Sequence, residues 1–343
     1  MTAERFINPR AVVTALVAAA FAYCAGAVTI GGEEGASVPA SVKVVGFLGE
    51  AGREDGQFNE PTDVAFDRSG RLYVVDSRNF RLQRFQPGGV FEYSFGRFGW
   101  EGEGLVSPYA LALAQELYIY VSDRERNLLH QYDIYGKYLK SYGQTPAITR
   151  QFENPGGLAV DNLGNLWVAD TDNHKVKRLN ALGETTLEVG YYGTELGKFN
   201  LPADVALDAH GRPLVAEAGN SRLQYFDRFG SPLAVILQTG DGTLKNPTAV
   251  SFDRFGNIFV SDTGNDRLAV FDADGRFLFA YGKFGRGGKD FNHPGGLAFG
   301  PAGNLYVADT YNNVIKVLEI EYRAPDRVEK PPRVPAPPGR DEN

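Results

Sequence analysis

Acidic side chains recur along this chain at positions where they could hold a cation. Six of them each end an apolar run and return at regular intervals: Asp76, Asp123, Asp170, Glu217, Asp262 and Asp309. In most copies Asn follows at the third position and Arg or Lys at the fifth, which suits a capped turn and an ion pair. We therefore expect these acids to stabilise the fold rather than to perform chemistry.

Asp63 and Asp204 are the weak candidates for a metal site, since each follows a recurring proline by two residues. A calcium-type site takes six to eight oxygen ligands, and two carboxylates make a poor cage. We expect each acid to accept a hydrogen bond from a neighbouring backbone N–H, and we predict no metal and no cofactor. The other four copies carry small residues here: Ala110, Gly157, Ala249 and Gly296.

The four histidines test for a metalloenzyme. His130, His174, His210 and His293 fall at four different places of the repeating unit, so they are not expected to converge on one ion. No serine, histidine and acid fall together as a nucleophilic set. Cys24 is the only cysteine, which excludes a disulfide within the chain.

A unit of four short strands, repeated six times, must position these residues. Apolar residues alternate within each unit, and Gly and Asn occupy the turns between the alternating segments. Four strands at a period of 40 to 50 residues are typical of a propeller blade. The sequence predicts an all-β fold, a six-bladed β-propeller over residues 42–322 with blades starting near residues 58, 105, 152, 199, 244 and 291. The prolines that mark the repeat are spaced by 47 residues four times and by 45 once: Pro61, Pro108, Pro155, Pro202, Pro247 and Pro294.

The run from Gly164 to Val176, GNLWVADTDNHKV, resembles the NHL repeat, and similar runs begin at Gly70, Gly256 and Gly303. The resemblance implies the propeller fold, which carries protein docking, RNA binding, sensing and some lyase or hydrolase activities. Lyases of this architecture place metal-binding histidines at corresponding positions of several blades. Hydrolases of the lactonase type bind a divalent ion in the channel through an acid plus Asn or Asp residues. The chain departs from both patterns.

The amino-terminal segment predicts export. Arg5 and Arg10 precede 20 uncharged residues, so residues 1–30 are expected to be a signal peptide or a helical membrane anchor. In either case the propeller lies outside the cytoplasm. Residues 31–41 are expected to form a flexible linker.

The sixth copy lacks a fourth strand of its own, because the chain meets Pro325 soon after its third strand. The strand expected at residues 42–48 should complete that blade and close the ring. Residues 323–343 are rich in proline and charge and are expected to be disordered.

The connectivity places the inter-blade connectors and the second-to-third turns on one face, which we name the connector face. Aromatic residues on glycine-containing connectors favour binding, as do the tyrosine and two arginines that set the second copy apart. The predicted partner-binding residues are Phe98, Trp100, Tyr109, Arg124, Arg126, Tyr191, Tyr192 and Phe284.

These observations favour an exported, non-enzymatic binding or scaffold propeller whose partner is a protein or a cell-envelope component. The formal net charge of −7 disfavours nucleic acid. The alternative is a metal-dependent lyase or hydrolase with its site at the central channel, and a ligand sensor is a third possibility.

Overall fold

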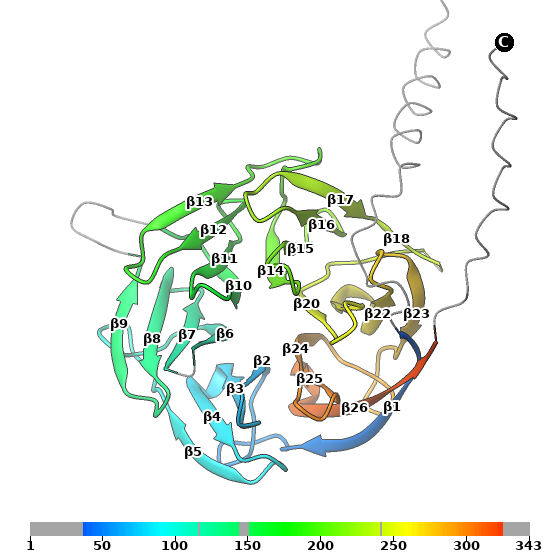
Figure 1. Ribbon diagram of the computed structural model, residues 1–343. Helices are drawn as coiled ribbons and strands as arrows, with labels where there is room; N and C mark the ends of the chain where they lie inside the picture. The colour runs from blue at the N-terminus through cyan, green and yellow to red at the C-terminus, as the bar shows by residue number, and fades with distance from the viewer. Residues whose placement is uncertain (1–36, 116, 144–150, 241, 325–343) are drawn as a thin grey trace, which may run out of the picture.

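The computed structural model describes residues 37–324 except 116, 144–150 and 241. Within these ranges the strands form six four-stranded antiparallel sheets and one two-stranded hairpin. The six sheets are arranged around a common centre, with the first strand of each blade innermost (Figure 1). The prediction of an all-β, six-bladed propeller is confirmed.

The first three blades each contain four consecutive strands, with a short helical turn, η1 (Ser77–Asn79), in blade one. Their strands are β2 (Pro61–Phe66), β3 (Leu72–Asp76), β4 (Arg81–Phe85) and β5 (Phe91–Phe95); β6 (Pro108–Ala114), β7 (Tyr118–Asp123), β8 (Leu128–Asp133) and β9 (Tyr138–Tyr142); and β10 (Pro155–Val160), β11 (Leu166–Asp170), β12 (Lys175–Leu179) and β13 (Thr185–Val189).

Blades four and five follow the same plan, and a hairpin occupies the connector between them. Their strands are β14 (Pro202–Leu207), β15 (Pro213–Glu217), β16 (Arg222–Phe226) and β17 (Pro232–Ile236); the hairpin strands β18 (Gln238–Thr239) and β19 (Gly242–Thr243); and β20 (Ala249–Phe252), β21 (Ile258–Asp262), η2 (Thr263–Asn265), β22 (Arg267–Phe271) and β23 (Phe277–Tyr281).

The sixth sheet combines the two ends of the described chain in the order β1-β26-β25-β24. β1 pairs antiparallel with β26, for example through Val44 and Leu318. The predicted linker, 31–41, is wrong in its last residues, because β26 runs to Arg323 and Val38 pairs with it. The bounds are β1 (Val38–Leu48), β24 (Pro294–Phe299), β25 (Leu305–Asp309), η3 (Thr310–Asn312) and β26 (Val314–Arg323).

The hydrophobic core lies between neighbouring blades. The second strands β3, β11, β15 and β21 are buried at every residue, because an adjacent sheet covers each of their faces. One apolar cluster, for example, joins Leu214 and Tyr225 of blade four to Ile258 and Val260 of blade five. Burial of this kind stabilises the ring blade against blade, at roughly 25 cal/mol for each Å² of apolar surface.

No helix among the described residues is long and apolar enough to cross a bilayer. The predicted export or anchor segment, residues 1–30, lies outside the described residues. The predicted disordered tail, 323–343, is wrong at Arg323, which pairs with Val38 as the last residue of β26, and its residues 325–343 lie outside the described residues.

Candidate functional site

The six acids that end the second strands are fully buried and anchor the connectors of the connector face. In blade one, the backbone N–H of Asn59 donates to Asp76 Oδ1 at 2.7 Å, while Asn79 and Arg81 each donate to Oδ2 at 2.8 Å. In blade six, the Lys316 ammonium lies 3.0 Å from Asp309. The geometry agrees with a structural role for this ring of carboxylates.

His130 belongs to the same buried network in blade two. Its Nε2 lies 3.6 Å from Asp123, and its Nδ1 lies 3.0 Å from the hydroxyl of Ser141. His130 occupies the position of the repeat that is Lys177 in blade three and Lys316 in blade six, and each of these lysines forms an ion pair with the acid of its own blade. The prediction that no serine, histidine and acid fall together is therefore wrong, because the pairing of the second, third and fourth strands brings Ser141, His130 and Asp123 into one row. His130 and Asp123 are fully buried, so we interpret this row as part of the blade framework.

The other three histidines lie apart from one another in the blade plan. His174 accepts the N–H of Leu201 at 3.1 Å, the inter-blade contact that Asn127 makes elsewhere. His293 stacks on Tyr311 at 4.7 Å, and His210 is exposed beside an aspartate. Across the described residues, no three His, Cys, Asp or Glu side chains are grouped so that they could hold a metal ion.

Asp63 and Asp204 bridge neighbouring blades. Asp63 accepts N–H groups from Val64 and from Leu111 of the next blade, both at 2.8 Å. Asp204 accepts the N–H groups of Val205 and Val250 in the same way, also at 2.8 Å. The expected backbone hydrogen bonds are therefore present.

The surroundings of the two acids disfavour their charged forms. Desolvation in the channel wall is the main cause that raises the pKa of Asp63 to about 8, and the charge of Asp204 adds to it. Desolvation likewise raises the pKa of Asp204 to about 6.

Each of these acids also packs on a glycine of the preceding blade. A Cβ added to Gly296 would lie 1.8 Å from Asp63 Oδ1, and one added to Gly157 would lie 1.7 Å from Asp204 Oδ1. The order Asp, Ala, Gly over blades one to three repeats over blades four to six. The pattern is explained by packing around the ring.

The centre of the connector face contains a hollow of about 370 Å³, which we name the channel mouth. The residues that begin the first strands and those that follow the second strands line it together, so the predicted pairing of these segments on one face is correct. Arg124 and Tyr109 of blade two lie here, with the guanidinium carbon 3.1 Å from the centre of the ring. The threonines of the wall were missed from the sequence, although they recur beside the repeated prolines and acids: Thr62, Thr171, Thr248 and Thr310.

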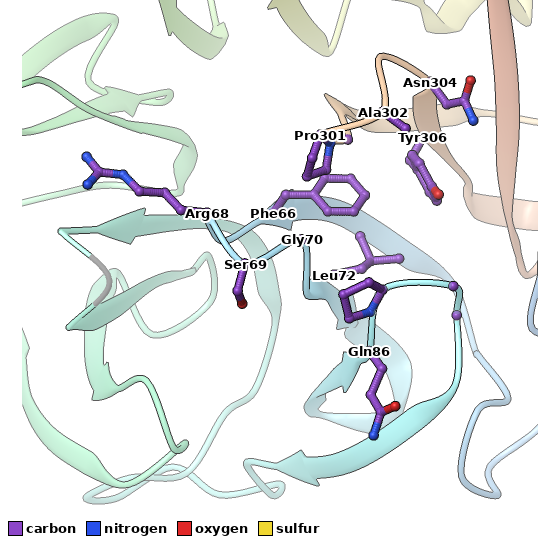
Figure 2. Close-up of a pocket in the computed structure, with 14 residues that line it drawn as sticks. Phe66, Arg68, Ser69, Gly70, Leu72, Gln86, Pro301, Ala302, Asn304 and Tyr306 are labelled. Carbon is purple, nitrogen blue, oxygen red and sulfur yellow. The ribbon is translucent and has the colours of Figure 1, made fainter.

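A second hollow, of about 280 Å³, lies at the inner strands and is lined by Asp63 and Asp204. A third, of about 230 Å³, lies between blades one and six among the short turns of the opposite face, which we name the turn face. There the rings of Phe66 and Tyr306 meet edge to face at 4.8 Å, and Figure 2 shows Arg68 extending away from them.

Arg124 and Arg126, which the sequence places with Trp100 among the predicted partner-binding residues, make different contacts. Arg124 lies over Tyr109, whereas Arg126 donates to the carbonyl groups of Gly102 and Gly104 in the connector that leads into blade two. In the part of the chain that the structure describes, neither arginine lies over the indole. The sequence placed both arginines on the connector face, but their side chains contact different groups.

The connector aromatics are exposed, and two of them are held by a neighbouring ring. Phe98 meets Phe80 at 4.9 Å, and Tyr192 meets His174 at the same distance. The exposed fractions are 57% for Phe98, 60% for Trp100, 59% for Tyr191, 67% for Tyr192 and 70% for Phe284.

Comparison with known protein families shows which family this chain belongs to. Residues 12–191, more than half of the chain, match the family described as the SMP-30/gluconolactonase/LRE-like region. The chain belongs to this family. Residues 291–318 match the NHL repeat, in agreement with the resemblance seen in the sequence.

Among individual proteins, Protein brain tumor of Drosophila melanogaster is 35% identical over 68 residues, which span 20% of this chain and 7% of that protein. Virginiamycin B lyase from Staphylococcus aureus superposes with a TM-score of 0.57 at 12% identity, over 82% of this chain and 100% of its own. An auxiliary nutrient binding protein from Bacteroides thetaiotaomicron superposes with a TM-score of 0.61 at 14% identity, over 82% of this chain and 76% of its own. These structural likenesses show the fold alone.

A divalent ion of the lactonase type does not fit the residues present. Such an ion needs several free oxygen ligands in the channel. The oxygens of Asp63 and Asp204 already accept backbone N–H groups, and the four corresponding positions carry alanine or glycine.

Proposed function

We propose that this chain is an exported binding propeller that docks a protein or a cell-envelope component through its connector face, without chemistry of its own. The observation that carries the proposal is the set of large aromatic side chains exposed on the connectors. Tryptophan, tyrosine and arginine are enriched among the residues that dominate protein interfaces.

The way these aromatics are held also supports binding. Parallel backbone bridges join Phe98 to Leu105, Tyr192 to Phe199 and Phe284 to Phe291, so each connector is a defined loop. A ring fixed on such a loop loses little conformational freedom when a partner covers it.

The turn face exposes apolar side chains as well, including Leu163, Leu182 and Phe229. Each of these occupies the same place in a short hairpin turn that closes with glycine. Single exposed apolar residues are ordinary on protein surfaces. They supply matched controls for the connector face.

The proposal is tested by partner capture and affinity measurement. Trp100→Ala should weaken the binding of a captured partner by on the order of 2 kcal/mol if the indole is an interface anchor. Phe229→Ala removes an equally exposed ring, 68% against 60%, from the turn face and should leave the affinity unchanged. Equal losses in both variants would refute the assignment of the face.

Two further parts of the proposal concern the ends of the chain. Export is supported by the uncharged run after Arg10. We also propose that β1 closes the ring, and its pairing with β26 in the sixth sheet supports this. A closed ring would keep the connectors of blades six and one in fixed positions relative to each other.

The alternative of a metal-dependent lyase or hydrolase draws support from the family and from the lyase among the structural neighbours. The channel carboxylates argue against it, because their oxygens are engaged by the backbone. Elemental analysis of protein purified without chelator, with Asp63→Asn as the control, would favour the enzyme if it found a stoichiometric metal that the variant loses.

A further inference from the structure

We propose that the channel mouth binds a carboxylate group and that Arg124 is the residue that holds it. The inference deepens the proposed function and rests on it, because the mouth opens at the centre of the connector face. It names the chemistry that a ligand or partner would bring to the middle of that face.

The first argument compares the six blades. The positions compared are the one after each recurring proline and the one after each second-strand acid, and ten of these twelve residues line the channel mouth. Blade two alone has large side chains at both positions, Tyr109 and Arg124. The other five blades hold small residues there: Thr62, Gly156, Ala203, Thr248 and Gly295 at the first position, and Ser77, Thr171, Ala218, Thr263 and Thr310 at the second.

This comparison separates the needs of the fold from the needs of the site. A residue required to build a blade recurs in nearly every blade. Five blades are built with small residues at both positions, so neither Tyr109 nor Arg124 is needed for blade geometry. Both are available for binding.

The second argument is the Nε donor of Arg124. Its Nε is buried and has no hydrogen-bond partner within the described ranges. No carboxylate among the described residues lies within ion-pair distance of its guanidinium. Buried donors without partners are uncommon in folded proteins, and such a donor in a hollow is suited to a ligand. The buried hydroxyl of Thr171, in the same wall, also lacks a partner.

The third argument concerns the charge of the ligand. The guanidinium presents parallel N–H groups that match a carboxylate. The other charges of the wall oppose a more negative ligand, because Glu60 and Asp172 also line the mouth. Arg78 is paired with Glu60 at 3.1 Å, which leaves Arg124 as the unpaired cation among the described wall residues. A single carboxylate therefore fits better than a phosphate.

Tyr109 is the residue that contacts Arg124 in the wall. The guanidinium lies over its ring. Burial is the main cause that raises the pKa of the Tyr109 phenol; the charge of Arg124 lowers this pKa, and the charges of Asp204 and Asp63 add to the burial.

The test measures binding by isothermal titration calorimetry with two matched pairs of probes. One pair is benzoate and benzamide, and the other is an acetylated dipeptide with a free carboxylate and the same peptide as its amide. We expect saturable binding of the acids, with the amides at least tenfold weaker. Tighter binding of benzoate would identify a free organic acid as the ligand class, and tighter binding of the peptide acid would identify a chain terminus.

The variants isolate Arg124. Arg124→Thr introduces the residue that blades three, five and six carry at this position and should lose at least tenfold in affinity. Arg124→Lys keeps the charge without the planar fork and should fall between the two. Arg78→Thr removes the paired arginine of the same wall and leaves Glu60 without its partner, so it should weaken binding by less than Arg124→Thr does. Thermal melts identify a variant that fails to fold.

Absence of saturable binding by either acid, equal binding of the amides, or undiminished binding by Arg124→Thr would overturn the proposal. Equal losses in the Arg78 and Arg124 variants would also overturn it. Because no partner protein is present, the outcome is independent of the Trp100→Ala experiment. Carboxylate binding that depends on Arg124, together with a partner indifferent to Trp100, would refute docking and retain this site.

Discussion

Substitution of Gly296 by alanine tests the packing that joins the first strands around the ring. The new Cβ would lie 1.8 Å from Oδ1 and 2.7 Å from Cα of Asp63, so the carboxylate and part of β2 must move. Overpacking of this kind costs roughly 1–3 kcal/mol. Displacement of the carboxylate also leaves the N–H groups of Val64 and Leu111 without their acceptor, at roughly 1–3 kcal/mol for each that stays buried.

Together these effects predict a loss of about 3–5 kcal/mol. For a domain of this size the loss corresponds to a fall in Tm of roughly 6–15 °C, measured by calorimetry or thermal circular dichroism. Gly157→Ala should behave in the same way, because its Cβ would meet Asp204 at 1.7 Å. Gly288→Ala is the matched control, since its Cβ would contact nothing within 4 Å.

A double-mutant cycle sharpens the test. In an Asp63→Ala background the added methyl group at Gly296 no longer meets a carboxylate, although it still approaches the Asp63 backbone. The two substitutions should therefore cost less together than their sum, by about 1 kcal/mol or more. The inter-blade role of Asp63 would be refuted if Gly296→Ala had the same Tm as Gly288→Ala. It would also be refuted if the free-energy losses of the Gly296 and Asp63 substitutions were additive.

Two other predictions concern ring closure and pH. Deletion of residues 42–48 should leave most of the outer edge of β26 unpaired and cause aggregation or loss of cooperative unfolding. A truncated protein that melts like the parent would contradict closure by this strand. The raised pKa values of Asp63, about 8, and Asp204, about 6, mean that the folded protein binds more protons than the unfolded chain between about pH 4 and 8. The contribution of these acids to the free energy of unfolding should therefore fall as pH rises through that range. Urea titrations at pH 5 and pH 8 should show a smaller fall in Asp63→Asn, and an unchanged fall would contradict the assignment.

The blade plan was predictable because it depends on local signals that recur. The interval between Pro61 and Pro108, repeated down the chain, contains four alternating segments separated by Gly and Asn turns, and few folds satisfy that spacing. The two faces followed from connectivity alone, since successive turns of a meander lie at opposite ends of its strands. The start of β1 was misplaced because Val38 is held by its pairing with Arg323, a contact from the far end of the chain.

The site was predictable only as a set of residues on one face. Arg124 and Arg126 are two residues apart, yet one lies over Tyr109 and the other binds the carbonyl groups of its connector. Which way a long side chain turns depends on acceptors and rings supplied by distant residues, and spacing carries no signal for these. The Asp, Ala, Gly order was visible in the sequence. Its cause, a carboxylate packed on the glycine of the preceding blade, required the ring to be assembled.

The ring also indicates where this protein can be specific. Around the channel wall, blades four to six repeat the Asp, Ala, Gly order of blades one to three, and that repetition serves packing. At the channel mouth the repetition is broken by Tyr109 and Arg124, both in blade two. A cation with a buried, unpartnered donor costs free energy unless a ligand supplies an acceptor. The same fold could carry small residues at both positions, as its other five blades do, so at the channel mouth this propeller departs from what its architecture requires.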